Sequence, residues 1–339
     1  ERRSFASFCA GNRADGRGVP AVDAFFIQGA NDVLFNLNEA VANHACLRAA
    51  GRDARLLVQT DGHIVPLLQS AGRQILFGTD AQVGCGSRVY DTAAMMLDFL
   101  DQKLMGHAPG PQSPPQTCIA LSAEQGLDLP GVPFGGVARS FDATPVIPGG
   151  SGLVVELLRG LPLQTLLSTL AGLGPEVLDV VLAVVRSPPG SVQEGTQAFI
   201  DLLPQIVNLL PSDLVQQLVA APVYIPLHAA GAGQALAGIP QATLSFSGGA
   251  GAPPLFVGIG LRRGGTGDVQ TVSEQVLPVL ARGEQTLDLI GVRTRLQAGD
   301  ELGLVIFGFH PYYANNSLLS LAPVPVQVSG TVNLPILVR

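Results

Sequence analysis

The residues from 22 to 63 constrain the fold most, because they spell a strand, a helix and a second strand in that order. Phe25–Ile27 is a short apolar run, and Leu56–Val58 is a second one. Both runs are typical of strands buried on both faces in a parallel sheet. Between them, apolar residues fall at helical spacing and a glycine supplies the stop: Leu37, Ala40, Val41, Ala45 and then Gly51.

Two polar residues follow the predicted strands. Asp32 comes just after the end of the first strand and His63 just after the end of the second. The carboxyl ends of parallel strands meet at one edge of an open α/β sheet, where ligands and chemistry gather. A carboxylate beside an imidazole holds the ring in one tautomer and stabilises its protonated form, so that the histidine can act as a general base. We therefore predict a catalytic pair. The alternative is an ordinary strand–helix–strand unit with a loop aspartate and a chance histidine.

The sequence around this pair resembles the α/β-hydrolase family. Ile27–Asp32 is similar to that family's acid loop and Asp61–His63 to its histidine loop, and Asp32 and His63 are 31 positions apart. The resemblance implies that Asp32 orients His63, while Asp61 is a competing acid whose strand should point it elsewhere. It also implies no cofactor.

Later segments resemble one branch of that family, the X-prolyl dipeptidyl-peptidases and cocaine esterases. Ser140–Gly150 resembles the crossover that leads from the catalytic domain toward a β-sandwich. Three further segments resemble sandwich strands of that branch: Ile239–Ser247, Gly299–Ile306 and Val328–Pro335. The resemblance covers residues 22–150 and 222–339 and leaves out 152–221, which departs from the pattern as an insertion.

The serine that this fold requires is not found where the family places it. In α/β-hydrolases the order along the chain is Ser, then Asp, then His. Only Ser4 and Ser7 precede Asp32, and the pentapeptide Gly-x-Ser-x-Gly occurs nowhere in the 339 residues. Cys9 is disfavoured as a nucleophile because no strand precedes it. We therefore expect the chain to be the carboxyl-terminal part of a larger enzyme, inactive alone, with the nucleophile on an amino-terminal segment.

Composition limits the class of protein and its partners. With 47% hydrophobic and 13% charged residues, the chain has the content of a well-packed globular protein. The net charge of −7 disfavours nucleic acid as a partner. The first residues lack the apolar core of a signal peptide and do not begin with Met, so a mature or cut product is expected.

The four cysteines bear on the compartment. None forms a Cys-x-x-Cys pair, so a zinc site is not expected. Cys85 and Cys118 flank one predicted helix and are candidates for a disulfide; the alternative is four buried free thiols. Cys9 is either the partner of Cys46 or free. A Cys85–Cys118 bridge would place the protein in an oxidising compartment, secreted or periplasmic.

The middle of the chain is helical in pattern. Residues 89–105 predict an amphipathic helix, the last helix of the hydrolase sheet, and residues 116–150 are interpreted as a connector. Residues 152–221 carry apolar stripes divided by prolines, and no charge lies between Arg159 and Glu176. We interpret this insert as a helical cap. Contact with a membrane surface, an oligomer interface, or plain core-packing helices are the alternatives.

From residue 222 the pattern changes to short alternating strands. Apolar residues alternate with polar ones in 242–247 and 324–328, and glycine and proline punctuate the runs. The predicted fold class is therefore α/β, the carboxyl-terminal portion of an α/β-hydrolase sheet, followed by a helical insert and an all-β jelly-roll-like sandwich. The predicted domains are 1–150, 151–221 and 222–339.

Two functions from different classes fit these observations. The first is a serine hydrolase that cleaves a small ester or peptide. An ester is favoured by the apolar insert, since the acidic groups with which X-prolyl peptidases grip a substrate amine are not located. The second is a non-catalytic module whose sandwich contacts carbohydrate or a partner protein. A polar loop offers candidate contacts: Tyr312, Tyr313, Asn315 and Asn316.

Overall fold

The computed structural model describes residues 18–60, 82–147, 222–247, 254–280, 282–308 and 324–338, with single positions 9, 164, 179, 182 and 310. His63, Asp61 and the polar loop of Tyr312 lie outside these residues. So does the predicted insert, apart from three positions, each helical. The insert and the three-domain division therefore stay predictions.

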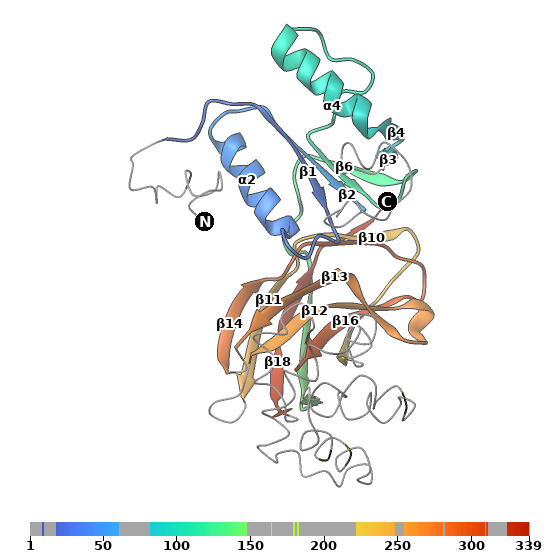
Figure 1. Ribbon diagram of the computed structural model, residues 1–339. Helices are drawn as coiled ribbons and strands as arrows, with labels where there is room; N and C mark the ends of the chain where they lie inside the picture. The colour runs from blue at the N-terminus through green and yellow to red at the C-terminus, as the bar shows by residue number, and fades with distance from the viewer. Residues whose placement is uncertain are drawn as a thin grey trace.

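The first sheet follows the predicted strand–helix–strand unit. Its order is β1-β2-β5-β6, with β1 parallel to β2 and β2 parallel to β5, while β6 runs antiparallel to β5. The bounds are β1 Ala24–Gly29, α2 Leu37–Ala49, β2 Ala54–Gln59, β5 Thr117–Ala120 and β6 Gly126–Leu129. Figure 1 shows this sheet, with its helices, at one end of the molecule and a β-sandwich at the other.

Alternation along β2 and β5 divides the core of this part into two faces. Leu56 and Ile119 point to the face that α2 covers, and Leu57 and Cys118 point to the opposite face, where α4 adds Met95. Helix α2 begins at an Asn36 cap and ends before Gly51, whose φ of 75° suits glycine. Ala45 is exposed, contrary to its predicted place on the apolar stripe.

The prediction that β1 is a central strand buried on both faces is wrong for the described sheet. β1 is its edge strand, and Ala24 to Gln28 are only half-buried, whereas Leu56 to Val58 of β2 are fully buried. β1 is less buried because, among the described strands, β2 pairs with one side of it and none pairs with the other.

A hairpin and a helix follow on the far face. β3 Gln82–Cys85 pairs with β4 Arg88–Asp91, and α4 Thr92–Leu100 continues into a π-helical turn, Asp101–Met105. The predicted helix 89–105 is thus confirmed from Thr92 onward. Its first residues belong to β4 because Asp91 caps the helix, its side chain accepting from the Ala94 amide. No helix in the described part of the chain is long and apolar enough to span a membrane.

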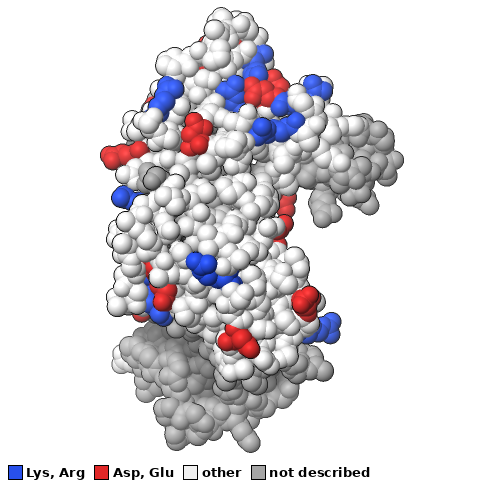
Figure 2. Space-filling view, turned by 180° about the vertical axis from the view of Figure 1, so that it is seen from behind, with Lys and Arg blue, Asp and Glu red and all other residues white. Residues whose placement is uncertain are grey.

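Charged residues tie the end of this helix to the amino ends of β1 and β2. Lys103 Nζ lies 2.6 Å from an Asp53 oxygen and 3.0 Å from an Asp23 oxygen. Arg55 adds two bonds to Asp53, at 2.9 and 3.1 Å, and both cations lie over the Phe99 ring. Figure 2 shows basic and acidic side chains side by side near this end of the molecule.

We expect Lys103→Met to lower the free energy of unfolding by about 1 kcal/mol at pH 7, a value discounted for partial exposure. Hydrogen bonds from Arg55, and then from Lys103, lower the pKa of Asp53 from 3.8 to about 2. Because the folded pKa lies below the unfolded one, this stabilisation is full above about pH 4 and is lost as the pH falls toward 2. Urea unfolding between pH 2 and 7 should show a shallower slope in Lys103→Met, and Lys103→Arg should restore it.

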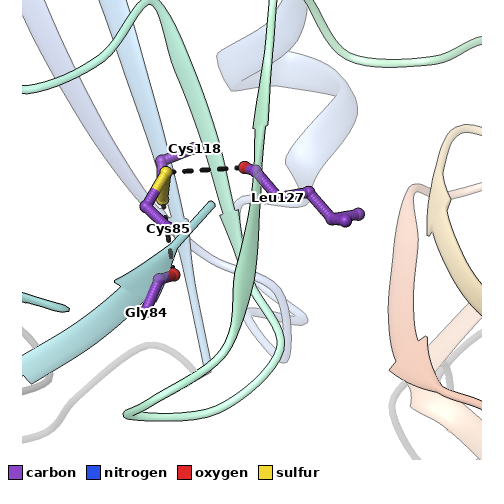
Figure 3. The surroundings of a disulfide bond; sticks show 4 residues. All are labelled: Gly84, Cys85, Cys118 and Leu127. Carbon is purple, nitrogen blue, oxygen red and sulfur yellow. Dashed lines mark hydrogen bonds between the residues drawn. A yellow bond between two sulfur atoms is a disulfide. The ribbon is translucent and has the colours of Figure 1, made fainter. Parts of the chain in front are cut away.

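Both cysteine pairs are disulfide-bonded. Cys85 and Cys118 have Cα atoms 5.6 Å apart, which confirms the predicted bridge, and Cys9 bonds to Cys46 with the same Cα separation. Figure 3 shows the first bond between β3 and β5, against the carbonyl groups of Gly84 and Leu127. The bond joins the hairpin, and through it α4, to the parallel sheet.

The predicted antiparallel sandwich is confirmed. One sheet has the order β14-β11-β18-β7 and the other β13-β12-β16-β9. Side chains from both inner faces, among them Leu244 and Ile259, form one core. In the order given, the strands of the sheet β14-β11-β18-β7 are Gly283–Asp288, Gln241–Ser247, Gln327–Leu334 and Val137–Ala143. Those of the sheet β13-β12-β16-β9 are Val269–Val279, Leu255–Arg262, Glu301–Phe307 and Val223–Ala229. A 3₁₀ turn, Arg263–Gly265, follows β12.

The interpretation of residues 116–150 as a connector is wrong. β5 is the third parallel strand of the first sheet, and β7 pairs with β18 along its whole length as part of the sandwich. β8, Val146–Ile147, pairs with β17, Val324–Pro325. These pairings join segments nearly 200 residues apart, which local sequence patterns cannot indicate.

A three-stranded sheet lies where the two parts meet. Its order is β15-β10-β19, with bounds Val292–Arg295, Gln234–Gly238 and Ile336–Val338. Ala237 of β10 belongs to the same core cluster as Leu37 and Val41 of α2. Asn38 also crosses this contact, because its Nδ2 donates to Leu289 O at 2.9 Å and its Oδ1 accepts from the Gly291 amide at 2.7 Å. The first sheet therefore rests on the sandwich through a packed interface.

Candidate functional site

The carboxyl ends of β1, β2 and β5 meet at one edge of the first sheet. This follows from the two parallel pairings, which carry the chain in the same direction through all three strands. The loop of Asp32 leaves β1 at this edge, and Thr60 leaves β2 beside it. Such an edge is where α/β folds place their chemistry.

Asp32 is a buried carboxylate held by its own loop, and 6% of it is exposed. Its Oδ1 accepts from the amides of Leu34 and Phe35, each at 2.9 Å, and its own amide donates to Gly29 O at 3.3 Å. Since the loop engages Oδ1, a histidine approaching from the next loop would meet Oδ2. The carboxylate has the burial and the fixed orientation that an acid of a catalytic pair requires.

The partner predicted for Asp32 lies outside the described residues. The structure describes the second loop as far as Thr60, three positions before His63. The Asp32–His63 contact, and the choice between Asp32 and Asp61, therefore stay predictions. What the structure brings together is Asp32 and the origin of the loop that carries His63.

One side chain of the sandwich and one of the sheet β15-β10-β19 hold these strand ends. Gln275 on β13 donates from Nε2 to Ala30 O and to Asp32 O, both at 3.1 Å. Arg293 on β15 donates to Ala120 O and Leu121 O at 3.0 Å, and to Thr60 O at 3.4 Å. Neither residue was predicted from the sequence, because a polar residue in an alternating strand normally predicts a solvent-facing side chain.

Ser122, on the turn after β5, is the serine that the described strand ends bring to this edge. Its hydroxyl oxygen accepts from the amides of Glu124 and Gln125, at 3.2 and 3.1 Å. A serine that closes a turn in this way is a structural residue. We therefore do not assign Ser122 as a nucleophile.

A hollow lies on the far side of α2, away from these strand ends. It encloses about 430 Å³ and is lined chiefly by His44, Arg48, Val132 and Phe134. His44 Nε2 lies 3.0 Å from Ala54 O, and burial lowers the pKa of its ring. The neutral ring is therefore a donor that secures α2 to β2, and the hollow has no acid beside the histidine.

Comparison with known proteins leaves the family open. No protein-family model matches the chain, and no curated protein matches it. Among solved structures it is similar to an α-amino acid ester hydrolase (11% identity, TM-score 0.48) and to an aminopeptidase from the marine sediment archaeon Thaumarchaeota archaeon (10%, 0.47). Each match covers 94% of this chain and 56% of the other.

A CocE/NonD family hydrolase from Staphylococcus aureus is also similar, at 10% identity and a TM-score of 0.43, with 96% of this chain and 56% of that one covered. The chain thus spans 56% of the length of these solved structures. All three are hydrolases by name. At TM-scores below 0.5 the likeness does not establish a family, so a functional assignment has to rest on the residues themselves.

Proposed function

We propose that this chain is part of a serine hydrolase that cleaves ester or amide bonds, with Asp32 and His63 as its acid and base. One observation carries the proposal: Asp32 is buried and oriented at the carboxyl edge of three parallel strands, beside the strand end that leads to His63. In the proposed mechanism His63 takes the proton from a serine hydroxyl as it attacks the acyl carbon. Asp32 stabilises the resulting imidazolium, and His63 then protonates the leaving group.

The nucleophilic serine is proposed to lie on an amino-terminal segment outside residues 1–339. Apolar surface around β1 supports such a partner: Leu34 is 67% exposed and Phe35 60%. A stripe on α4 and the turn after it is exposed as well, at Leu97, Leu100, Leu104 and Met105. An edge strand with apolar surface beside it is a template for a further strand.

The remaining features fit this proposal. The eight strands of the two sandwich sheets can be numbered 1 to 8 in chain order, from β7 as 1 to β18 as 8. The order is then 1-8-3-6 in one sheet and 2-7-4-5 in the other, which supports a jelly roll. We propose that residues 152–221 form a cap at the mouth of the site, with contact to a membrane surface as the alternative. A small ester is the preferred substrate over a peptide. The two disulfides support a secreted or periplasmic location.

Residues 1–339 expressed alone should associate and should not hydrolyse a small ester such as p-nitrophenyl acetate. Association is expected because the edge of β1 and the apolar residues beside it would be bare. A sizing column at low protein concentration and a rate measurement test both expectations.

The matched control is the protein expressed from its complete reading frame, which should be active and in which a serine-directed fluorophosphonate should label a serine outside residues 1–339. A monomer of residues 1–339 whose hydrolysis depends on His63 would contradict the proposed position of the nucleophile.

A further inference from the structure

The strand that carries Gln275 is distorted at that point. β13 and β12 pair regularly up to Gly258–Val276 and again from Gly260–Thr271, so that the four residues 272–275 stand opposite Ile259 alone. Ser273 and Glu274 both have φ of 56°, and they are the only non-glycine residues with positive φ in the described part of the chain. Each costs on the order of 1 kcal/mol, and such strain persists where the surroundings impose it.

The bulge directs one side chain to the acid loop and another to the backbone of Arg293. Gln275, 3% exposed, turns its amide toward the acid loop and gives both hydrogens to Ala30 O and Asp32 O. Ser273 Oγ lies 3.4 Å from both the amide and the carbonyl oxygen of Arg293. A bulge that re-aims side chains is a recurrent device next to active sites.

Arg293 extends this arrangement to the other strand ends. Its guanidinium bonds carbonyl oxygens at the ends of β5 and β2, the second being Thr60 O. A planar fork of donors can span two strands in this way, whereas a single ammonium group cannot. The strained segment thus secures the loop of Asp32 through Gln275. Its Ser273 contacts the backbone of Arg293, and the side chain of Arg293 secures Thr60 at the end of β2.

We infer that Gln275 and Arg293 are positioning residues for the Asp32–His63 pair, which makes the sandwich part of the catalytic framework. The inference rests on the proposed function. Gln275 fixes the position of the Asp32 loop relative to the sheet. Arg293 fixes the point at which the chain that leads to His63 leaves the sheet. A shift of about 1 Å in either loop would cost up to about 100-fold in rate, because the pair would no longer meet at hydrogen-bond distance.

The test is a double-mutant cycle in the protein expressed from its complete reading frame, with p-nitrophenyl acetate as substrate. Gln275→Met should lower kcat about 10- to 100-fold and leave KM within about twofold. In an Asp32→Asn background the same change should cost less than about threefold more, because Gln275 acts through Asp32. A merely structural role would give the same loss in both backgrounds.

Controls separate this inference from general damage. Asn38→Ala removes two hydrogen bonds across the same interface but none at the strand ends, so kcat should stay within about twofold. Gln275→Asn keeps the amide and shortens its reach, and Arg293→Lys keeps the charge and loses the fork; both should fold, as judged by circular dichroism, and lose about 10-fold in kcat.

The outcomes are distinct. If His63→Ala leaves hydrolysis unchanged, the proposed function fails. If His63→Ala abolishes hydrolysis while folded Gln275→Asn and Arg293→Lys keep the wild-type kcat, or if the cycle is additive, the positioning inference is overturned and the proposed function stands.

Discussion

Replacing Asp32 by asparagine should lower kcat for a small ester by about 10⁴-fold without unfolding the protein that carries this chain. Asparagine keeps an oxygen at Oδ1, so the amides of Leu34 and Phe35 keep their acceptor and the loop keeps its shape. What is lost is the negative charge that holds His63 in the productive tautomer and stabilises its protonated form. Steady-state rates and a thermal melt of the same sample measure the two effects separately.

Asp61→Asn is the matched control, because Asp61 is the acid next to His63 in the sequence. We expect its kcat to stay within about threefold of wild type. Asp32→Ala should lose activity as Asp32→Asn does and, since both loop amides then lose their acceptor, should also lose about 1–3 kcal/mol of stability. A large loss in Asp61→Asn together with an active Asp32→Asn would transfer the role to Asp61.

Local patterns predicted the parts of the fold whose causes are local. The strands of Phe25–Ile27 and Leu56–Val58, the helix near Leu37 and a helix within 89–105 were predicted from apolar runs and helical spacing, and the structure has each of them. In the last helix, however, Leu97, Leu100 and Leu104 of the expected apolar stripe are exposed. The sandwich was predictable in part for the same reason, since strands such as β11 alternate between more and less buried residues, whereas β12 and β16 are buried along nearly their whole length. The place of Asp32 just after a strand was predicted as well, whereas its burial was not.

Pairings between distant segments were beyond such patterns. β7 joins the sandwich by pairing with β18, nearly 200 residues away, and such a partner leaves no mark on a window of ten residues. The edge position of β1 depends on which strands flank it, and the pattern of β1 itself does not show this. Gln275 and Arg293 escaped notice for a related reason. Their role arises where the sandwich meets the first sheet. Ser273 and Glu274 are not glycines, so the sequence does not indicate the positive φ angles at these positions.

Removing the Cys85–Cys118 disulfide, by Cys85→Ala with Cys118→Ala, should lower the free energy of unfolding by about 5 kcal/mol. Closing a loop across 33 residues contributes about 3–4 kcal/mol in the chain-entropy account. The two lost sulfurs add about 1–2 kcal/mol, because Cys118 is fully buried and Cys85 2% exposed within a cluster that includes Leu57 and Met95. Guanidinium unfolding followed by circular dichroism measures the sum.

The Cys9–Cys46 pair provides the control within the same chain. Its separation of 37 residues gives almost the same loop entropy, about 0.1 kcal/mol more, but Cys9 lies at the surface. Cys9→Ala with Cys46→Ala should therefore cost less, by about the packing contribution of one buried sulfur, because Cys46 is buried and only Cys9 lies at the surface. In denaturant, no thiol of the wild-type protein should react with a thiol reagent until a reductant is added, because all four cysteines are in disulfide bonds. Equal losses in the two double variants would assign the whole effect to loop closure, and four reactive thiols without reductant would refute both bonds.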